Sequence, residues 1–456
     1  MAHIVFIMFS ENSAYRGSLG AARVLKQSGH KVTYLGIAQY RELVEQNGLQ
    51  FQAFGYDQEL EASLQKENEA QIDQAQKKMK FLKPLRLIRL RMKLDECTHQ
   101  QLERKMKEDL ATWIDQVIPD LVFLDQLFMW GYALPLLQSR VPVAGINCIL
   151  SDAATPGLPP VTTSYIPKAH PTEPDIKRAK KEWNRLYRKR LWDYWFSDGR
   201  TLRKKIAATG TGLRWQEFGY KLDIPEIVLF PPEFEFSSKG NNPSRSYVGA
   251  FTGHMHSTSG DHQDLLSDDH RRLIYMSFGN IVTGEHYAGD REKLYTSFMT
   301  YLANKPQLQG IMQVSDPEEA EQYRIQCPDN VRVESRVPQI EVLKKASLFI
   351  SHCGCSSVRE AMHFGVPVLG LPFALDQPGN AARLQYHGAG LIADPSELTE
   401  GRLSRMIDRM LDDPAFAENA RKLQKAFDRL ENTLKLTRFV SKYMKTEKSE
   451  NAPIRS

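Results

Sequence analysis

Short apolar runs alternate with stretches of helical spacing from the first residues onward. An apolar run over residues 4–8 is followed by a loop over 9–18, helical spacing over 19–27 and a second apolar run over 32–36. Apolar runs separated by helices are typical of parallel strands that crossover helices bury on both faces. The opening of the chain therefore predicts a βαβ unit.

The same pattern returns later in the first half of the chain. Apolar runs cover 121–125 and 141–146, and residues 130–138 between them have helical spacing. Residues 57–117 are polar with helical character, so we predict a helical insertion there. A basic and aromatic helix is expected over about 176–206, and its aromatic stripe suits either core packing or the wall of an acceptor pocket.

A change of composition divides the chain into two domains. Gly, Asn, Pro and Ser dominate residues 237–246, so this segment is predicted to link an N-terminal domain of residues 1–236 to a second α/β domain of residues 247–420. A last helix is expected at about 421–445, crossing back to the first domain, before a disordered tail at 446–456. Two doubly wound halves joined in this way place the ligand cleft between them, at the carboxyl ends of the strands.

Composition narrows the class of protein. The 456 residues are 41% hydrophobic and 25% charged, as in a globular protein with a sizeable core. The net charge of +5 is small for this length and does not indicate binding of nucleic acid. The five cysteines are not spaced as a disulfide set, no apolar run is long enough to span a membrane, and residues 1–9 lack the features of a signal peptide. These observations predict a cytoplasmic protein.

The residues that carry chemistry are concentrated in residues 334–390. A strand pattern there ends in the small-residue turn His-Cys-Gly-Cys-Ser-Ser, which opens a helix. Backbone N–H groups at a helix start favour an anion, and His352, Ser356 and Ser357 add side-chain donors at the same place. This turn is a predicted phosphate site.

Two further groups follow the turn in chain order. Glu360, one helical turn later, suits the paired hydroxyls of a ribose, while Asp376 and Gln377 suit the hydroxyls of a hexose. Partners for a phosphate, a ribose and a hexose in this order describe a nucleoside diphosphate sugar.

The segment resembles the donor-binding signature of inverting UDP-sugar glycosyltransferases with the GT-B fold. The family pattern is roughly W-x-P-Q, then H-x-G-x-N-S-x-x-E, then D/E-Q; here it reads Arg-Val-Pro-Gln at 336–339, the turn and helix at 352–360, and Asp-Gln at 376–377. The resemblance implies an α/β protein of two Rossmann-like, doubly wound domains with the active site in the cleft between them. It also implies a hexosyltransferase that uses UDP-glucose, with no metal and no permanently bound cofactor.

The resemblance further implies a role for each matched residue. Arg336 stands where the family has a base-stacking Trp, although a guanidinium can stack on a base too, and Ser356 replaces an Asn. The resemblance assigns the diphosphate to His352 and Ser357, in the turn that also holds Gly354 and Ser356, and to the Ser-x-Gly turn of Ser277, which Asn280 follows. It assigns the ribose to Glu360, and the base to Gln339 with Arg336 and Val337. It assigns the transferred sugar to Asp376 and Gln377.

A weaker resemblance extends over the whole chain. Residues 124–160 and 371–390 are similar to the branch that glucosylates hydroxylated carotenoids such as zeaxanthin, which implies an apolar hydroxylated acceptor. Residues 77–93 hold eight Lys or Arg and no acid, with apolar residues at helical spacing. Such a stretch is either a solvated basic helix face or a peripheral contact with anionic lipid at the inner face of the membrane.

No residue is an obvious candidate for the general base of the reaction. The family uses a His at a fixed spacing before a G-H-x-V-T motif, and counting back from His30 leads to Ala14. Asp125, which matches the Asp that orients this His in the family, is one replacement, acting directly or through water. Glu11 or another loop residue such as Tyr15 is a second, and an acceptor acidic enough to need little help is a third. The remaining alternative is loss of catalysis.

The predicted function is thus transfer of a hexose to a hydroxyl of an apolar small molecule with inversion. The alternatives are a non-catalytic homologue acting as an accessory or binding protein, a sugar-nucleotide epimerase, and a transferase acting on a carotenoid, lipid or peptidoglycan intermediate. Cys353 and Cys355 lie close to His352, but small-residue packing in a phosphate turn explains this spacing better than a metal site.

Overall fold

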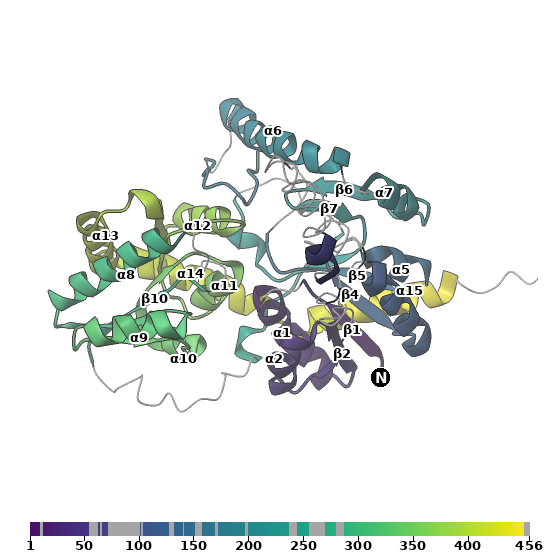
Figure 1. Ribbon diagram of the computed structural model, residues 1–456, viewed down its shortest axis with the longest axis horizontal. Coiled ribbons are helices and arrows are strands. Elements are labelled where there is room, and N and C mark those ends of the chain that lie inside the picture. Colours follow the sequence, from purple (N-terminus) through teal and green to yellow (C-terminus); the bar gives the residue numbers. More distant parts are fainter. Residues whose placement is uncertain are drawn as a thin grey trace, which may run out of the picture.

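The computed structural model contains two α/β units, each built on its own parallel sheet with helices on both faces (Figure 1). It describes residues 1–9, 12–53, 63, 66–71, 101, 104–126, 132–139, 141–150, 157–168, 172–196, 199–236, 244–254, 270–279 and 287–450, with the side chains of 189–202, 215, 219 and 445–450 excepted. Glu11, Asn280, the basic stretch 77–93, most of the linker and residues 451–456 lie outside the described part of the chain.

The first unit has a seven-stranded sheet in the order β3-β2-β1-β4-β5-β8-β9, and all neighbouring strands are parallel. Its central strands are apolar and fully buried because helices cover both faces. The strands are β1 (His3–Ile7), β2 (Lys31–Gly36), β3 (Gln50–Ala53), β4 (Leu121–Asp125), β5 (Val143–Asn147), β8 (Glu226–Val228) and β9 (Arg245–Tyr247).

Helices and one hairpin surround this sheet. The predicted βαβ opening is present, but the helix begins at Asn12, earlier than the predicted start at residue 19. The reason is tertiary packing, because Ala14, Tyr15, Gly17 and Ser18 are all buried although Gly and Ser favour helices only weakly. The elements are α1 (Asn12–Gln27), α2 (Arg41–Gln46), α5 (Ala133–Gln138), α6 (Glu173–Phe196), α7 (Gly199–Ala207) and the antiparallel strands β6 (Leu213–Gln216) and β7 (Gly219–Leu222).

The second unit has a six-stranded parallel sheet in the order β12-β11-β10-β13-β14-β15. Its strands are β10 (Arg272–Ser277), β11 (Leu308–Gln313), β12 (Val331–Glu334), β13 (Ala346–Ser351), β14 (Val368–Gly370) and β15 (Gly390–Ile392). Its helices are α8 (Ala288–Ala303), α9 (Pro317–Gln326), α10 (Gln339–Lys345), α11 (Cys355–His363), α12 (Gln377–Tyr386), α13 (Glu400–Asp412) and α14 (Pro414–Leu430).

The boundary between the units differs from the one predicted. Strand β9 pairs with β8 and forms the edge of the first sheet, so the second unit begins after it and not at residue 247. The composition of the linker marks the right region, but composition does not reveal that a three-residue strand at its end, residues 245–247, pairs with the first sheet.

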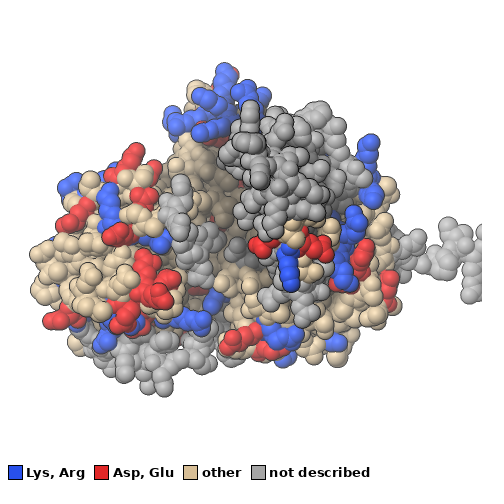
Figure 2. Space-filling model, viewed as in Figure 1, with Lys and Arg blue, Asp and Glu red and all other residues tan. Residues whose placement is uncertain are grey.

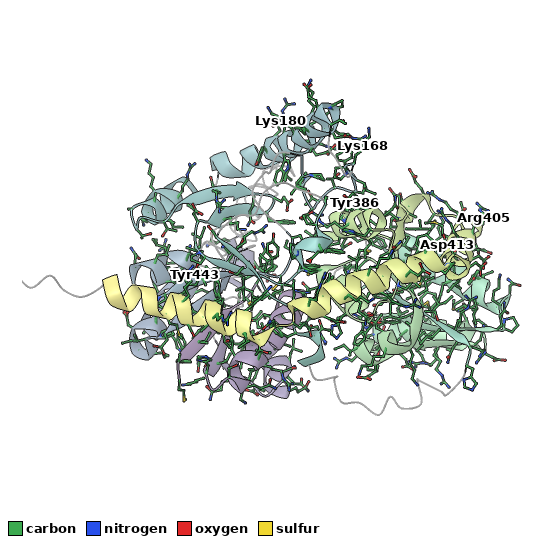
Figure 3. All side chains as sticks on the ribbon, turned by 180° about the vertical axis from the view of Figure 1, so that it is seen from behind. Lys168, Lys180, Tyr386, Arg405, Asp413 and Tyr443 are labelled. Carbon is green, nitrogen blue, oxygen red and sulfur yellow. The ribbon has the colours of Figure 1, made fainter. Side chains whose placement is uncertain are left out.

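Two helices, not one, join the units at the end of the chain. Helix α14 packs in the second unit and α15 (Thr433–Glu450) in the first, so the pair runs across the back of both units from Asp413 to Tyr443 (Figure 3). Leu436, Phe439 and Val440 of α15 are buried in the core of the first unit. The helix continues beyond the predicted end at residue 445.

Basic side chains gather over α6 at one end of the molecule (Figure 2). Lys177, Lys181 and Arg188 are exposed on this helix, whereas Ala179 and Trp183 on its opposite face are buried. Within the described residues, no helix is long and apolar enough to cross a membrane.

Candidate active site

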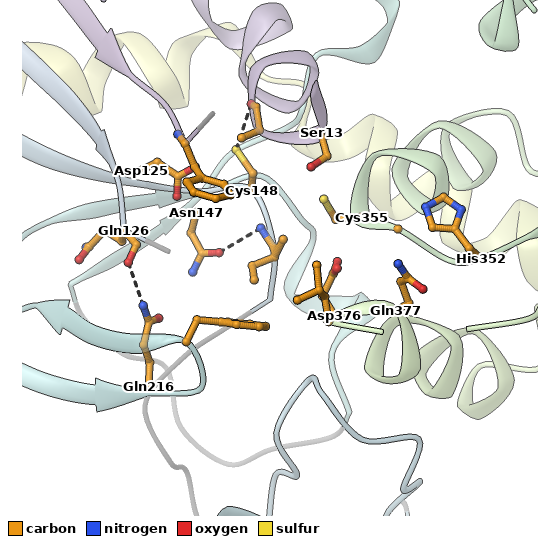
Figure 4. A pocket seen from close by; sticks show the side chains of 16 residues that line it. Ser13, Asp125, Gln126, Asn147, Cys148, Gln216, His352, Cys355, Asp376 and Gln377 are labelled. Atoms are coloured by element: carbon orange, nitrogen blue, oxygen red, sulfur yellow. Dashed lines mark hydrogen bonds between the residues drawn. The ribbon is translucent and has the colours of Figure 1, made fainter. Parts of the chain in front are cut away.

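A cavity of about 250 Å³ lies between the two units and is lined by both of them (Figure 4). The carboxyl ends of β4, β5 and β13 and the segment after β14 open onto it, which is where doubly wound sheets place their ligands. The first unit contributes Phe9, Ser13, Ala14, Asp125, Gln126, Asn147, Cys148, Ile149, Gln216 and Phe218, and the second contributes His352, Gly354, Cys355, Leu375, Asp376 and Gln377.

The turn between β13 and α11, the predicted phosphate site, forms part of the cavity wall. Gly354 occupies the N-cap position of α11 without a capping side chain, and the N–H of Cys355 that follows it donates to the carboxylate of Asp376. The N–H groups further along the first turn are the ones left for an anion. Cys353 makes the bend with a left-handed backbone (φ 64°), held by a hydrogen bond from its N–H to Ser351 Oγ at 3.1 Å. The local sequence thus forms a strand-to-helix turn at the place where the motif predicts a phosphate site.

His352 is buried beside this turn and points toward it. Burial lowers the pKa of His352 to about 4, so the ring is neutral at neutral pH. Its Nδ1 is buried and has no hydrogen-bond partner among the described residues, as expected of a group that bonds to a ligand. Gly279 (φ 63°) leaves room for the ring, because a Cβ there would lie 2.9 Å from His352 Cε1.

A hydrogen-bonded network beside the cavity connects several predicted donor residues. Ser277 donates to Gln313 Oε1 at 3.0 Å, and the hydroxyl of Tyr275 lies 2.8 Å from the same oxygen and 3.1 Å from Gln339 Oε1. Gln339 in turn donates to Glu360 Oε2 at 2.6 Å. Tyr275 and Gln313 are outside the sequence motif, and their part in orienting Ser277 and Gln339 is visible only in the fold.

Glu360 is buried, with 6% of its surface exposed. Burial raises the pKa of its carboxyl group, while the hydrogen bond from Gln339 and the positive charge of Arg16 lower it. Arg16 belongs to α1 of the first unit, so a residue of that unit acts electrostatically on the predicted ribose site. Neither the motif nor the spacing indicated this neighbour.

Asp376 and Gln377 lie together where α12 begins. Gln377 Oε1 accepts hydrogen bonds from the backbone N–H groups of Phe373 and Ala374 at 2.8 and 3.0 Å, which fixes the amide and leaves its NH₂ group to donate. Burial raises the pKa of Asp376 to about 6, and a hydrogen bond from Asn380 Nδ2 at 2.7 Å opposes this shift. Asn380, one turn into α12, is a supporting residue that the sequence motif missed.

Other residues of the motif lie away from the cavity wall. Arg336 is exposed, and Val337 packs against the core of the second unit. Ser356 donates to the carbonyl oxygen of Ser13 at 3.1 Å, so its hydroxyl binds the first unit instead of facing an open site. Ser357 is half-buried and is not among the lining residues.

On the side of the first unit, Asp125 ends strand β4 and is 3% exposed. Its Oδ2 accepts a hydrogen bond from the N–H of Phe9 at 3.4 Å, and Ala14 lines the cavity nearby. Tyr15 faces the other way. It is fully buried, its ring stacks on Tyr40 at 4.2 Å, and burial raises its pKa, so it does not fit the role of a base.

The hairpin of β6 and β7 closes this wall of the cavity. Gln216 donates to the carbonyl oxygen of Gln126 at 2.8 Å, and Gln126 Oε1 accepts the N–H of Leu222 at 2.9 Å, which ties the hairpin to the end of β4. Phe218 at the turn then lines the cavity. Trp183 of the aromatic stripe packs in the fold instead, with Nε1 donating to the carbonyl oxygen of Leu158 at 2.8 Å.

Among the described residues, no three His, Cys, Asp or Glu side chains are grouped so that they could hold a metal ion.

Sequence relatives support the reading of the second unit. Residues 303–429 match the family described as Erythromycin biosynthesis protein CIII-like, C-terminal domain. The uncharacterized UDP-glucosyltransferase YdhE of Bacillus subtilis (strain 168) is 32% identical over 165 residues, which are 36% of this chain and 39% of that protein. Oleandomycin glycosyltransferase of Streptomyces antibioticus is 29% identical over 199 residues, 43% of this chain and 44% of that protein. The chain thus matches less than half the length of either relative.

Solved structures extend the likeness to the whole chain. The glycotransferase of kitacinnamycin superposes with a TM-score of 0.64 at 18% identity, covering 97% of this chain and 99% of that chain. Glycosyltransferase VinC, solved in complex with DTDP, superposes with a TM-score of 0.62 at 19% identity, covering 97% and 100%. Two parallel-sheet units around a shared cavity define the chain as a GT-B protein. Residues 303–429 and the partial matches to these relatives make the second unit similar to UDP-sugar glycosyltransferases.

Proposed function

We propose that this protein transfers a hexose, glucose from UDP-glucose, to a hydroxyl group of an apolar small molecule with inversion at the anomeric carbon. One observation carries the proposal. A single cavity brings Asp125 from one unit opposite His352, Asp376 and Gln377 from the other, so a base and a donor site face the same space.

On the donor side, the start of α11 stabilises the negative charge of the leaving diphosphate. Backbone N–H groups of the first turn of this helix donate hydrogen bonds to the phosphate oxygens, because preorganised donors stabilise developing charge most effectively. The neutral ring of His352, whose single N–H is directed at the carbonyl oxygen of Ser277, lines the site beside them. Glu360 takes the ribose hydroxyls, and Asp376 and Gln377 hold the hexose by its hydroxyls. No step of this scheme requires a metal.

On the acceptor side, Asp125 removes the proton of the attacking hydroxyl, directly or through one water molecule. The acceptor oxygen forms a bond to the anomeric carbon while the bond to the diphosphate breaks, and a single displacement of this kind inverts the configuration. Phe9, Ile149, Phe218 and Leu375 give the cavity apolar walls, which suit a hydrophobic acceptor.

The test is turnover with defined donors and acceptors. The purified protein is incubated with UDP-glucose, dTDP-glucose and other nucleotide sugars, together with phenols, terpenoid alcohols and hydroxylated carotenoids, and the products are identified by mass spectrometry. A hexosylated acceptor with inverted configuration supports the proposal. A carotenoid or lipid product whose formation requires anionic vesicles assigns a membrane-resident acceptor and peripheral membrane contact instead of a soluble one.

A second function is favoured by Ala14. This residue lines the cavity at the position where the family places its catalytic His, and a methyl group transfers no proton. A non-catalytic homologue that binds nucleotide sugar as an accessory protein is therefore the alternative. Tight binding of UDP without transfer to any acceptor and without donor hydrolysis would select it.

A further inference from the structure

Two arginines of the second unit are buried where the units meet, each with 2% of its surface exposed. Arg383 on α12 makes an ordinary buried ion pair: its Nε and Nη2 lie 2.8 and 2.6 Å from Glu235 Oε1, in the segment after β8. Arg359 on α11 forms no ion pair with a carboxylate of any described residue. The two side chains share burial and location but differ in whether their charge is neutralised.

Arg359 inserts into the first unit and binds only neutral groups there. Its Nη1 donates to the carbonyl oxygen of Cys148 at 3.2 Å, and its guanidinium carbon lies 5.4 Å from the centre of the Phe230 ring. A Cβ at Gly17 of α1 would lie 2.4 Å from Nη2, so the first unit leaves a glycine-sized space for this side chain. Arg359 is thus enclosed by three elements of the opposite unit.

The same side chain also holds the start of α11. Its Nη2 donates to Ser356 Oγ at 3.1 Å, and Ser356 donates to the carbonyl oxygen of Ser13 at 3.1 Å. Arg359 therefore links the end of β5, the start of α1 and the first turn of α11. Ser13, Cys148 and Cys355 from these segments line the cavity, so Arg359 lies directly behind its wall.

The positive charge of Arg359 affects the pKa of two groups that line the cavity. Burial raises the pKa of both Asp376 and the Cys355 thiol, and the charge of Arg359 is among the influences that oppose these shifts. A buried cation that only neutral groups contact is costly, because hydrogen bonds to carbonyl and hydroxyl groups replace only part of its hydration. The carboxylates of Asp376 and Glu360 supply part of the counter-charge from a distance, and an anion placed in the cavity would add to it.

We propose that Arg359 is a positioning residue for the donor diphosphate. Arg359 joins the two units and supplies, behind the start of α11, a positive charge that no ion pair among the described residues neutralises. This inference rests on the proposed function. It predicts that binding of the diphosphate depends on the charge of Arg359, whereas binding of the nucleoside part does not.

The experiment compares affinities for UDP and uridine, with dTDP and thymidine as a second pair, by titration calorimetry. Arg359→Met and Arg359→Gln remove the charge, Arg359→Lys keeps it without the two-pronged contact, and Arg383→Met is the matched control at the neutralised arginine. We expect the two neutral variants to lose about tenfold in affinity for the diphosphates and less than about twofold for the nucleosides. Arg359→Lys should keep most of the preference for diphosphate.

The control separates this role from a structural one. Arg383→Met leaves Glu235, whose side chain is 17% exposed, without its partner, so it should lower the unfolding temperature while the ratio of UDP to uridine affinity stays unchanged. Equal losses for UDP and uridine in the neutral Arg359 variants, or no loss of UDP affinity, would overturn the inference alone. A wild-type protein that binds no nucleoside diphosphate would overturn the proposed function as well.

Discussion

The two walls of the cavity are built in different ways. The wall of the second unit comes from two strand-to-helix turns close in sequence, and its side chains are fixed by short local hydrogen bonds such as those from Phe373 and Ala374 to Gln377. The wall of the first unit gathers residues from the end of β1 to the β6–β7 hairpin, held by contacts such as Gln216 to Gln126. The proposed donor side is therefore mainly a local motif, whereas the proposed acceptor side is a product of tertiary structure.

This difference separates recognition of the nucleotide sugar from specificity for the acceptor. A donor site held mainly by its own turns depends on the first unit at a few points only, through Ser356 and Arg359. The acceptor wall depends on loops and a hairpin that can vary without disturbing either sheet, which is how a scaffold accepts new acceptors. Substitutions on the two walls should therefore affect different kinetic constants.

The largest effect is expected at Asp125. Asp125→Asn keeps the shape of the side chain but removes the base, so kcat should fall by about a hundredfold or more. The affinity for UDP, measured by calorimetry, should remain within about twofold of wild type because the donor wall is untouched. A loss of rate smaller than about tenfold would show that Asp125 is not the base. Glu11→Gln would then be the next variant to measure.

The next effect is expected on the donor wall. Asp376→Asn replaces an acceptor-only carboxylate by an amide of the same shape, and the loss of a charge-assisted hydrogen bond to a sugar hydroxyl should weaken UDP-glucose binding by about tenfold. UDP itself, which lacks the hexose, should bind as before. If both ligands weaken equally, Asp376 supports the phosphate turn and does not contact the sugar.

A pH dependence sharpens the same assignment. Asp376 has a raised pKa of about 6 because of burial, so its carboxylate is ionised above this pH and takes up a proton below it. The affinity for UDP-glucose should therefore fall as the pH is lowered through about 6, while the affinity for UDP falls less. In Asp376→Asn this difference between the two ligands should be independent of pH. A wild-type ratio that is flat between pH 5 and 8 would contradict the prediction.

The smallest effect is expected at the hairpin. Phe218→Ala removes an apolar surface from the acceptor wall without touching the donor site. The KM for an apolar acceptor should rise by about threefold to tenfold, the loss expected for part of an aromatic contact, and the KM for UDP-glucose should not change. Gln216→Ala, which loosens the hairpin by removing its bond to Gln126, should change the preference among acceptors more than the rate with any one of them.

The sequence predicted the two sheets because apolar runs identify the strands. The motif predicted donor residues of which His352, Asp376 and Gln377 line one cavity, and their roles stay a prediction. It did not predict the support given by Tyr275 and Asn380, since a hydrogen bond to a neighbouring strand or helix leaves no pattern along the chain. The early start of α1 was missed because tertiary packing holds Gly17 and Ser18 in the helix although both residue types favour helices only weakly.

One property of the last helix bears on how the protein is made. Leu436, Phe439 and Val440 of α15 complete the hydrophobic interior of the first unit, although more than four hundred residues separate them from β1. During synthesis the first unit can form its sheet early, but it lacks this cover until the ribosome has released the final segment. The first unit therefore completes its core last, after the second unit has already been translated.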